Sequence, residues 1–381
     1  MNDRFNGHLC IVFALEHYNP LNMIRAFGEN GIMPVYVSVK RRYEVATRSK
    51  YISRLYRVDS VEAGYNLLMT EYGSEVEKTG KKPYIVFSDD KSVGFFDLHY
   101  EEWKDKFITY NAGRQGCINE FMDKYNIQQL AKKHGFNVLD SYVIGKKDPL
   151  PENLWYPIIT KDISPNSGSW KGDVFVCQNE QELKEAIAKI TSPLIMIQHF
   201  VDKQNEMALE GYCINKGKEM QIITQMKWKY LIQGYYSPYH DVCMFTDKEM
   251  EEKLLAMFEE IGFEGVFEVE FLIDKDGTFY FMETNFRASA WNPTCKFAGM
   301  PLPYLWIKGM ENGCIDPSDR KSFEPFTSMS EVIDYGKRVE GGMCSIAEWL
   351  RDFKDAKCVY IYDKEDRGPW DEVIKNFENF K

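Results

Sequence analysis

The feature that most constrains this chain is a predicted β-hairpin that carries acidic residues where apolar ones would be expected. Residues 266–273 alternate in polarity, the segment DKDG at 274–277 has the composition of a tight turn, and residues 278–282 alternate again. Glu268, Glu270 and Glu283 interrupt an otherwise apolar and aromatic pattern. Buried carboxylates are costly unless they are paired or bind a metal ion, so the segment predicts a polar site.

The register of this hairpin decides how close the acids lie. If Ile273 faces Thr278 across the turn, Glu270 faces Phe281 and lies diagonal to Glu283. Diagonal neighbours on adjacent strands are roughly 7–8 Å apart, which allows two long carboxylates to converge on one cation. The alternative is a surface hairpin with a solvated acidic face.

The second strand continues with polar residues at every second position. Glu283, Asn285 and Arg287 share one face as far as the strand stays extended. Two carboxylates and an amide oxygen suit Mg²⁺ together with phosphate oxygens, and they do not suit zinc. We therefore predict Glu270, Glu283 and Asn285 as metal ligands, with an arginine directed at the same place.

This arrangement resembles the metal-binding hairpin of the ATP-grasp superfamily. The family pattern has an acid in the first strand, a glutamate thirteen residues later, and Glu-x-Asn-x-Arg; Glu270, Glu283, Asn285 and Arg287 match it. The resemblance implies ATP as cofactor and Mg²⁺ as the metal, with Mn²⁺ as a substitute. It also implies that two lysines and an adenine-binding hinge precede the hairpin.

Three upstream segments match those parts in the family's order. Asp123-Lys124 opens a predicted helix that ends at His134-Gly135, which resembles the lysine that binds the nucleotide phosphates. A short apolar strand ends at Lys161, and a loop of small residues, SPNSGS at 164–169, follows it like a phosphate cradle. The alternatives are an exposed helix lysine and an ordinary polar loop.

The third segment, PLIMIQHFVDKQNEMALEG, reads as a strand, a hinge and a second strand. The resemblance implies that backbone groups of the hinge bind adenine and that Glu206 meets the ribose, with Glu210 as the alternative. Lys227 and Lys229 lie on a later predicted strand, where one could reach the γ-phosphate or a substrate; the alternative is a solvated edge strand. The implied nucleotide-binding residues are Lys124, Lys161, Ser167, Gly168, Ser169, Gln198, His199, Phe200, Val201, Glu206 and Lys227.

The fold class expected is α/β and α+β. The patterns predict a strand at 8–15, a helix at 21–30, and a helix at 247–261 that Gly262 ends. Strands alternating with helices predict an open parallel α/β domain over residues 1–112, whose strand ends near Glu16 and His17 are where such sheets present ligand contacts. The resemblance implies a two-lobed ATP-grasp fold at 113–325, with a nucleotide lobe at about 113–200 and a catalytic lobe at about 201–325. Residues 326–381 are left as a small C-terminal module.

Composition narrows the class of protein further. A net charge of −11 argues against a nucleic-acid partner, and no apolar run reaches the roughly 18–20 residues needed to span a membrane. Nine cysteines are scattered without zinc spacing, and no signal peptide is evident, so we expect reduced thiols in a cytoplasmic protein.

The function implied by the resemblance is an ADP-forming ligase. A substrate carboxylate would attack the γ-phosphorus of ATP, and an amine would displace phosphate from the resulting acyl phosphate to form an amide or peptide bond. Lys161 and Arg287 are the expected catalytic residues, the substrates are expected to be an amino acid or peptide, and a homodimer is the expected assembly. The branch most similar is that of carbamoyl-phosphate-synthase-like and D-aspartate-ligase-like enzymes. The alternatives are an acyl- or carbamoyl-phosphate-forming enzyme with a non-amine acceptor, and an inactive ATP-binding regulatory protein.

Overall fold

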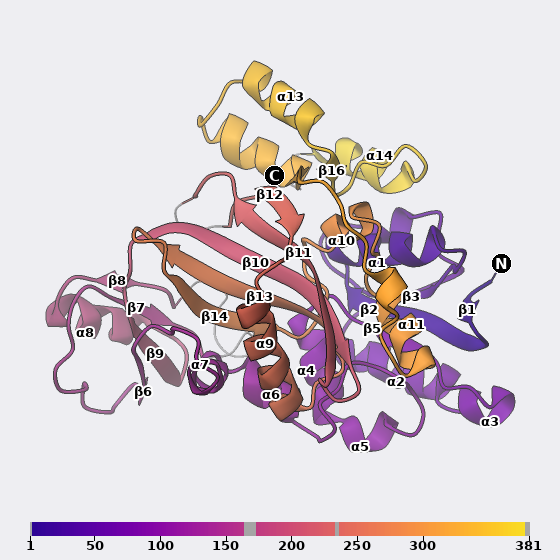
Figure 1. Cartoon of the computed structure of the whole chain (residues 1–381), viewed down its shortest axis with the longest axis horizontal. Helices are drawn as coiled ribbons and strands as arrows, with labels where there is room; N and C mark the ends of the chain where they lie inside the picture. Colours follow the sequence, from indigo (N-terminus) through magenta and orange to yellow (C-terminus); the bar gives the residue numbers. More distant parts are fainter. Residues whose placement is uncertain (1, 164–172, 233–235, 378–381) are drawn as a thin grey trace.

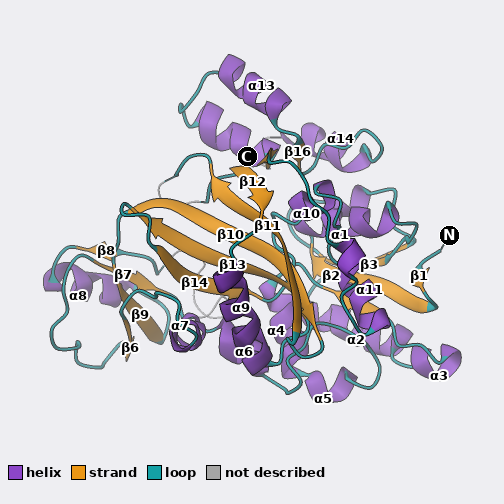
Figure 2. Cartoon of the chain, in the orientation of Figure 1, coloured by secondary structure: helices purple, strands orange, loops and turns teal. Residues whose placement is uncertain are grey.

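The computed structural model describes residues 2–163, 173–232 and 236–377 of the chain (Figure 1). These residues form sheets of five, seven and four strands, with helices packed around them (Figure 2). In these ranges no helix is both long and apolar enough to cross a membrane. The predicted residue boundaries at 112 and 325 stay predictions.

The first sheet is open and parallel except for its short first strand. The strand predicted at 8–15 is present as β2, and it lies between β3 and β5. The predicted helix at 21–30 begins earlier, at Tyr18, because Pro20 falls in the first turn, where a missing N–H leaves no hydrogen bond unmade. The elements are β1 (Arg4–Phe5), β2 (His8–Leu15), α1 (Tyr18–Gly28), β3 (Val35–Val39), η1 (Ala46–Arg48), β4 (Arg54–Val58), α2 (Val61–Tyr72), α3 (Glu75–Thr79), β5 (Tyr84–Val86), α4 (Asp90–Leu98) and α5 (Tyr100–Trp103).

The four-stranded sheet has a hydrophobic core of its own, separate from the main core of the molecule. Apolar side chains of its strands pack against α8 through Leu183 and Ala186. In Figure 1 this sheet lies at the left, with α7 between it and the central sheet. The elements of this part are α6 (Cys117–Met122), α7 (Lys124–Lys133), β6 (Ser141–Gly145), β7 (Ile158–Lys161), β8 (Val176–Cys177), α8 (Glu180–Lys189) and β9 (Leu194–His199).

The seven-stranded sheet has the order β14-β13-β10-β11-β12-β15-β16, and its neighbours are antiparallel except for the last pair. The helix predicted at 247–261 is confirmed: the Asp247 side chain accepts from the N–H of Met250, and Gly262 ends the helix with φ of 75°. The elements are β10 (Lys203–Ile214), β11 (Glu219–Trp228), β12 (Tyr239–Met244), α9 (Lys248–Ile261), β13 (Gly265–Asp274), β14 (Phe279–Asn285), α10 (Pro293–Phe297), α11 (Tyr304–Asn312), η2 (Pro317–Asp319), β15 (Phe326–Met329), α12 (Glu331–Asp334), η3 (Tyr335–Glu340), α13 (Ile346–Asp355), β16 (Cys358–Val359) and α14 (Gly368–Lys375).

The predicted hairpin is β13 and β14, but its register differs from the expected one. Asp274 closes a three-residue loop with Thr278, because Gly277 adopts a left-handed backbone with φ of 79°. A bulge then places one extra residue, Met282, on β14. The two shifts put Glu270 directly opposite Glu283, where the sequence predicted a diagonal arrangement.

Residues near the C-terminus are joined to the first helix by a buried ion pair. Arg25 of α1 and Asp366 are each 1% exposed, and Arg25 Nε lies 3.0 Å from Asp366 Oδ2. The same guanidinium donates to the backbone oxygens of Tyr360, Ile361 and Asp366. The segment that follows β16 is therefore part of the N-terminal packing.

Candidate functional site

The acidic and amide side chains predicted from the hairpin do come together on one face of the central sheet. Asn285 Nδ2 donates to Glu268 Oε2 at 2.9 Å and to Glu270 Oε1 at 3.3 Å. Glu283 stands opposite Glu270, and Arg287 donates to Asn285 Oδ1 at 3.0 Å. The bulge at Met282 brings the two predicted carboxylate ligands closer than a regular hairpin would.

The electrostatics of this cluster fit a cation between the carboxylates. Burial raises the pKa of Glu270 well above its ordinary value, and repulsion from Glu268 and Glu283 adds to the rise. Glu268 Oε1 has no hydrogen-bond partner in the described part of the chain. No three His, Cys, Asp or Glu side chains in that part form a ready metal centre, so two carboxylates and an amide would need phosphate oxygens or water to complete a Mg²⁺ shell.

Lys124 is the first residue of α7, and its side chain reaches Glu283 of the hairpin. Its N–H donates to the Ile163 oxygen at 2.8 Å, which ties the helix to the end of β7. Asp123 caps the helix by accepting from the N–H groups of Tyr125 and Asn126. The Lys124 ammonium is ion-paired with Glu283, and although burial opposes ionisation, this lysine holds the pKa of Glu283 below its ordinary value.

Lys161 lies at the end of β7, on the side of the four-stranded sheet that faces the hairpin. Its ammonium donates to Gln198 Oε1 at 2.7 Å. Burial, together with the nearby positive charge of Lys124, lowers the pKa of Lys161 to about 8. The structure therefore brings both predicted lysines to one place, with one of them poised to titrate near neutral pH.

Gln128 is a site residue that the sequence reasoning missed. Its amide accepts from Gln198 Nε2 at 2.9 Å and donates to the oxygen of Met282, the bulged residue, at 2.8 Å. It lies four residues after Lys124 and is buried, so the i, i+4 spacing along one helix face was the available signal. Gln128 thus links Lys161, through Gln198, to the strand that carries Glu283.

The predicted hinge runs from the end of β9 into β10. The Phe200 N–H donates to the Pro157 oxygen at 3.0 Å, while the His199 ring stacks on Trp155 with centroids 3.7 Å apart. His199 is the register partner of Ile158 and faces away from Lys161, so only its backbone can contribute to the site. Val201 follows in the connection to β10. The loop residues Ser167, Gly168 and Ser169 lie outside the described residues.

Glu206 and Glu210, the two candidates for the ribose, have different surroundings. Glu206 accepts from Trp228 Nε1 at 2.8 Å and is ion-paired with Lys203. Glu210 is fully buried beside Glu268 and accepts from the hydroxyl of Ser289. The partly exposed Glu206 is the better placed of the two to contact a ligand.

Lys227 does not reach the cluster, contrary to the prediction. Its register partner on β10 is Met207, which faces the opposite side of the sheet from Glu206. Its ammonium lies 5.6 Å from the ring centroid of Phe279. The error follows from the strand alternation: Trp228, one residue on, is the β11 side chain that faces the site.

The strand end at Glu16 is structural. Its carboxylate accepts from Tyr36 and Ser38 hydroxyls and from the N–H groups of Val45 and Thr47. Nothing remains on this carboxylate to meet a ligand, so the expected ligand contact is not found at Glu16. A carboxylate that follows β5, a neighbour of β2 in the sheet, is better placed to meet a ligand.

That carboxylate belongs to Asp90, the first residue of α4, and it pairs with Arg287. Arg287 Nε lies 3.0 Å from Asp90 Oδ1, and Nη2 lies 3.3 Å from Oδ2. Arg287 Nη1 is also 3.5 Å from Glu268 Oε2. Sequence spacing could not reveal this pair, because 197 positions separate the two residues.

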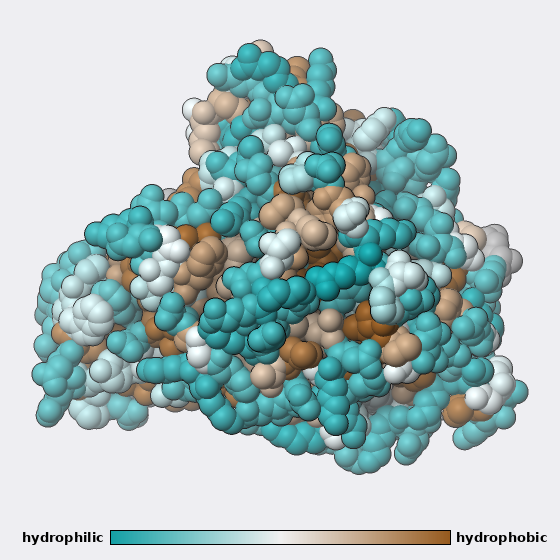
Figure 3. Space-filling model, in the orientation of Figure 1, coloured by the Kyte–Doolittle hydropathy of each residue, from teal (hydrophilic) through white to brown (hydrophobic). Residues whose placement is uncertain are grey.

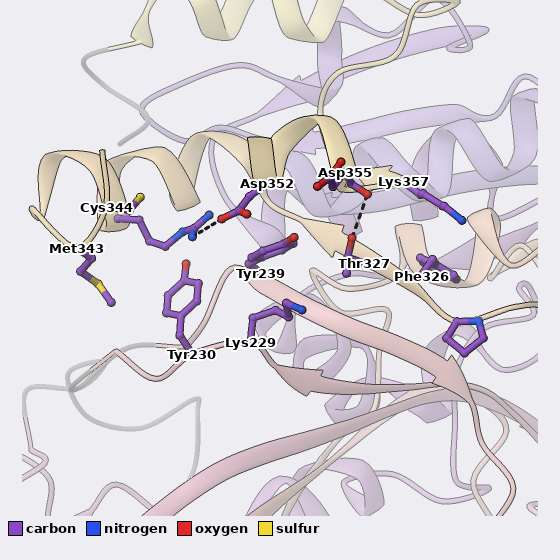
Figure 4. Close-up of a pocket in the computed structure, with 12 residues that line it drawn as sticks. Lys229, Tyr230, Tyr239, Phe326, Thr327, Met343, Cys344, Asp352, Asp355 and Lys357 are labelled. Carbon is purple, nitrogen blue, oxygen red and sulfur yellow. Dashed lines mark hydrogen bonds and ion pairs between the residues drawn. The ribbon is translucent and has the colours of Figure 1, made fainter. Parts of the chain in front are cut away.

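A hollow lies away from these residues, between β11, β12 and β15 and the helix α13 (Figure 4). Its volume is about 710 Å³. Arg338 stands beside it, between the rings of Tyr230 and Tyr239, and its guanidinium bonds Asp334 and Asp352. Lys229 lies here, 3.0 Å from Asp241, and so it too is away from the acidic cluster.

Hydrophilic residues cover most of the face shown in Figure 3, with hydrophobic ones in small separate patches.

Comparison with known proteins agrees with this geometry. Residues 123–310 match the family model described as carbamoyl-phosphate synthase L chain, ATP binding domain. The chain is 27% identical to the D-alanine–D-alanine ligase of Fusobacterium nucleatum over 171 residues, which are 43% of this chain and 55% of that protein. It is 23% identical to the propionyl-CoA carboxylase alpha chain of Ruegeria pomeroyi over 204 residues, 49% of this chain and 29% of that protein.

The structural comparison extends over more of the chain. The L-amino acid ligase of Bacillus licheniformis superposes with a TM-score of 0.63 over 84% of this chain and 78% of that one, at 13% identity. The likeness shows a shared fold. Family match, fold and the arrangement of the two lysines, the acids and Arg287 agree, and the chain belongs to the ATP-grasp superfamily of ATP-dependent ligases and carboxylases.

Proposed function

We propose that this protein is an ATP-dependent carboxylate–amine ligase that forms an amide or peptide bond through an acyl phosphate. One observation carries the proposal: Lys124, Lys161, Glu270, Glu283 and Arg287 converge where the four-stranded sheet faces the central sheet. Opposed cations and carboxylates of this kind suit a triphosphate with its metal ion.

In this proposal the two lysines hold the phosphates of ATP. Lys124 exchanges its ion pair with Glu283 for a phosphate oxygen, and Lys161 adds a second positive charge from the other sheet. Backbone groups at residues 199–201 hold adenine, and Glu206 accepts from the ribose hydroxyls. Glu270, Glu283 and Asn285 would hold Mg²⁺, which would supply positive charge to the phosphates.

Arg287 would act on the charge that develops during the reaction. It follows the predicted metal ligands by two residues and contacts Asn285, which supports a role next to the γ-phosphate. A guanidinium donates two parallel hydrogen bonds to an acyl phosphate or to the oxyanion of its tetrahedral adduct. An amine then displaces phosphate.

Amino acids or peptides are the proposed substrates, by likeness to the D-alanine–D-alanine ligase and the L-amino acid ligase. The likeness to a propionyl-CoA carboxylase alpha chain supports a second candidate, an acyl-phosphate-forming enzyme whose acceptor is not an amine. The predicted divisions at 112 and 325, a cytoplasmic location and a homodimer are part of the proposal. The chain spans 29% and 55% of the curated relatives it matches, so their whole activities are not carried over.

Release of ADP and phosphate from Mg²⁺-ATP tests the proposal directly. The purified protein is supplied with a pool of carboxylates, a pool of amines, or both, and Glu283→Gln is the control. We expect release that needs both pools and falls at least about 100-fold in the variant, because a predicted metal ligand has lost its charge. Release with carboxylate and bicarbonate alone would favour the second candidate, and ATP binding without any release would favour a regulatory protein.

The lowered pKa of Lys161 predicts proton uptake when ATP binds. At pH 8 about half of the Lys161 side chains are neutral, and phosphate charge favours the ammonium form and so raises this pKa. Affinity for ATP should therefore fall as pH rises through about 8, whereas near pH 6.5 Lys161 is already charged and should take up little. Calorimetry in buffers of different ionisation enthalpy measures the uptake, which should disappear in Lys161→Met; equal uptake in that variant would contradict the assignment.

A further inference from the structure

Asp90 reaches the catalytic side of the molecule from a different sheet. It follows β5 of the N-terminal sheet, while Arg287 follows β14 of the central sheet. The two chain segments are joined by their backbones, since the Ala288 N–H donates to the Phe87 oxygen at 3.3 Å. The Asp90 carboxylate is thus held at the site by fixed elements and not by a free loop.

Asp90 occupies the edge of the Arg287 guanidinium that an anionic substrate group would need. Nε and Nη2 form the bidentate edge, and both contact Asp90. Glu268 approaches Nη1, so two carboxylates already face one guanidinium. When an acyl phosphate takes the bidentate edge, Asp90 loses its cation while its side chain remains only 23% exposed.

A partly buried carboxylate without a cation costs free energy unless another cation replaces the first. The neighbouring Asp89 brings no positive charge, since it is itself a carboxylate that accepts from the N–H groups of Ser92 and Leu15. Lys124, now paired with Glu283, and Lys161 both bind phosphate in the proposed complex. The proposed Mg²⁺ would be held by Glu270, Glu283 and Asn285. The group that can arrive with the right charge is the ammonium of the second substrate.

We infer that Asp90 binds the ammonium group of the amine substrate and takes a proton from it. The inference rests on the proposed function and names the residue that receives the second substrate. It assigns that substrate to the class of primary amines that are cationic at neutral pH, amino acids among them. Asp90 alternates between two partners, Arg287 before the acyl phosphate forms and the ammonium afterwards.

The bond changes balance with these groups. Asp90 accepts one proton from the ammonium, and the nitrogen lone pair attacks the acyl carbon to give a tetrahedral adduct. The adduct collapses, the bond from carbon to the phosphate oxygen breaks with its electron pair, and an amide forms. The leaving phosphate takes the second nitrogen proton and departs as hydrogen phosphate, and Asp90 returns its proton to solvent.

Hydroxylamine separates the two half-reactions. It is mostly unprotonated near neutral pH, so it can trap an acyl phosphate as a hydroxamate without losing a proton to Asp90. The wild type and Asp90→Asn are compared with Mg²⁺-ATP and a pool of the proteinogenic amino acids, with and without hydroxylamine. We expect Asp90→Asn to lower amide formation at least about 100-fold and to leave hydroxamate formation within about twofold.

The Michaelis constant for the carboxylate adds a readout that a purely structural role would not move in this way. Because Asp90 no longer competes for Arg287, the KM for the carboxylate in the hydroxamate assay should fall. Asp59→Asn is the matched control, since its side chain is 86% exposed and pairs only with Lys40 on the surface. It should leave both reactions unchanged.

The outcomes decide between roles. Equal loss of amide and hydroxamate in Asp90→Asn, with an unchanged melting temperature, would show that Asp90 only positions Arg287 and would overturn the inference. No loss in either reaction would overturn it as well. If the wild type forms no hydroxamate from any carboxylate, the proposed function fails first, and the inference falls with it.

Discussion

Replacing Arg287 with lysine is expected to lower the rate of ADP release at saturating ATP by about 100- to 1,000-fold. Lysine keeps the positive charge but cannot donate two parallel hydrogen bonds to an oxyanion. In this structure Arg287 already makes such a bidentate contact, because Nε and Nη2 donate to the two carboxylate oxygens of Asp90. An acyl phosphate would have to be held by the same two donors.

Stability should change little in this variant, since an ammonium still faces Asp90 and Glu268. The measurement is therefore kcat for ADP release together with a thermal melt. Arg54→Lys is a matched control, because Arg54 is exposed on β4, which belongs to a different sheet from the hairpin. A kcat within tenfold of the wild type in Arg287→Lys would rule out the proposed role of the guanidinium.

Replacing Arg25 with alanine is expected to destabilise the fold by about 3–5 kcal/mol, because removal of one partner leaves a buried charge uncompensated. Asp366 is 1% exposed, and without Arg25 it keeps only the Ser49 hydroxyl and the Lys50 N–H. Three backbone oxygens would also lose a donor. Few single substitutions outside the apolar core carry such a cost.

Urea unfolding followed by intrinsic fluorescence measures this effect as a lower midpoint. Lys40→Ala serves for comparison, because it breaks an exposed ion pair with Asp59 that should contribute less than about 1 kcal/mol. If Arg25→Ala and Lys40→Ala shifted the midpoint equally, the buried pair would not be stabilising this part of the fold.

Local patterns predicted much of this structure from the sequence. The apolar run at 8–15 forms a buried parallel strand, and Asp247 and Gly262 bound their helix as capping chemistry requires. Glu283 and Asn285 share a face of β14 as side-chain alternation predicts, since their partners on β13, Glu270 and Glu268, are also two residues apart. Each of these features depends on neighbours in the chain.

Other features depend on contacts that spacing does not encode. The bulge at Met282 is stabilised by Gln128, a residue of a distant helix, so a regular register was the natural but wrong expectation. The side of the sheet that Lys227 faces was predicted wrongly, because that side is set by its pairing with Met207. Asp90 was missed because its partner, Arg287, comes from another sheet.

The buried ion pair between Arg25 and Asp366 has a consequence for folding during translation. The partners of this helix residue are synthesised 335 to 341 positions later, so a nascent chain on the ribosome holds α1 without them. Until residues 360–366 emerge, the Arg25 guanidinium lacks the carboxylate and the backbone oxygens that it binds in the folded chain. The emergence of these residues is then also the event that completes the packing around α1.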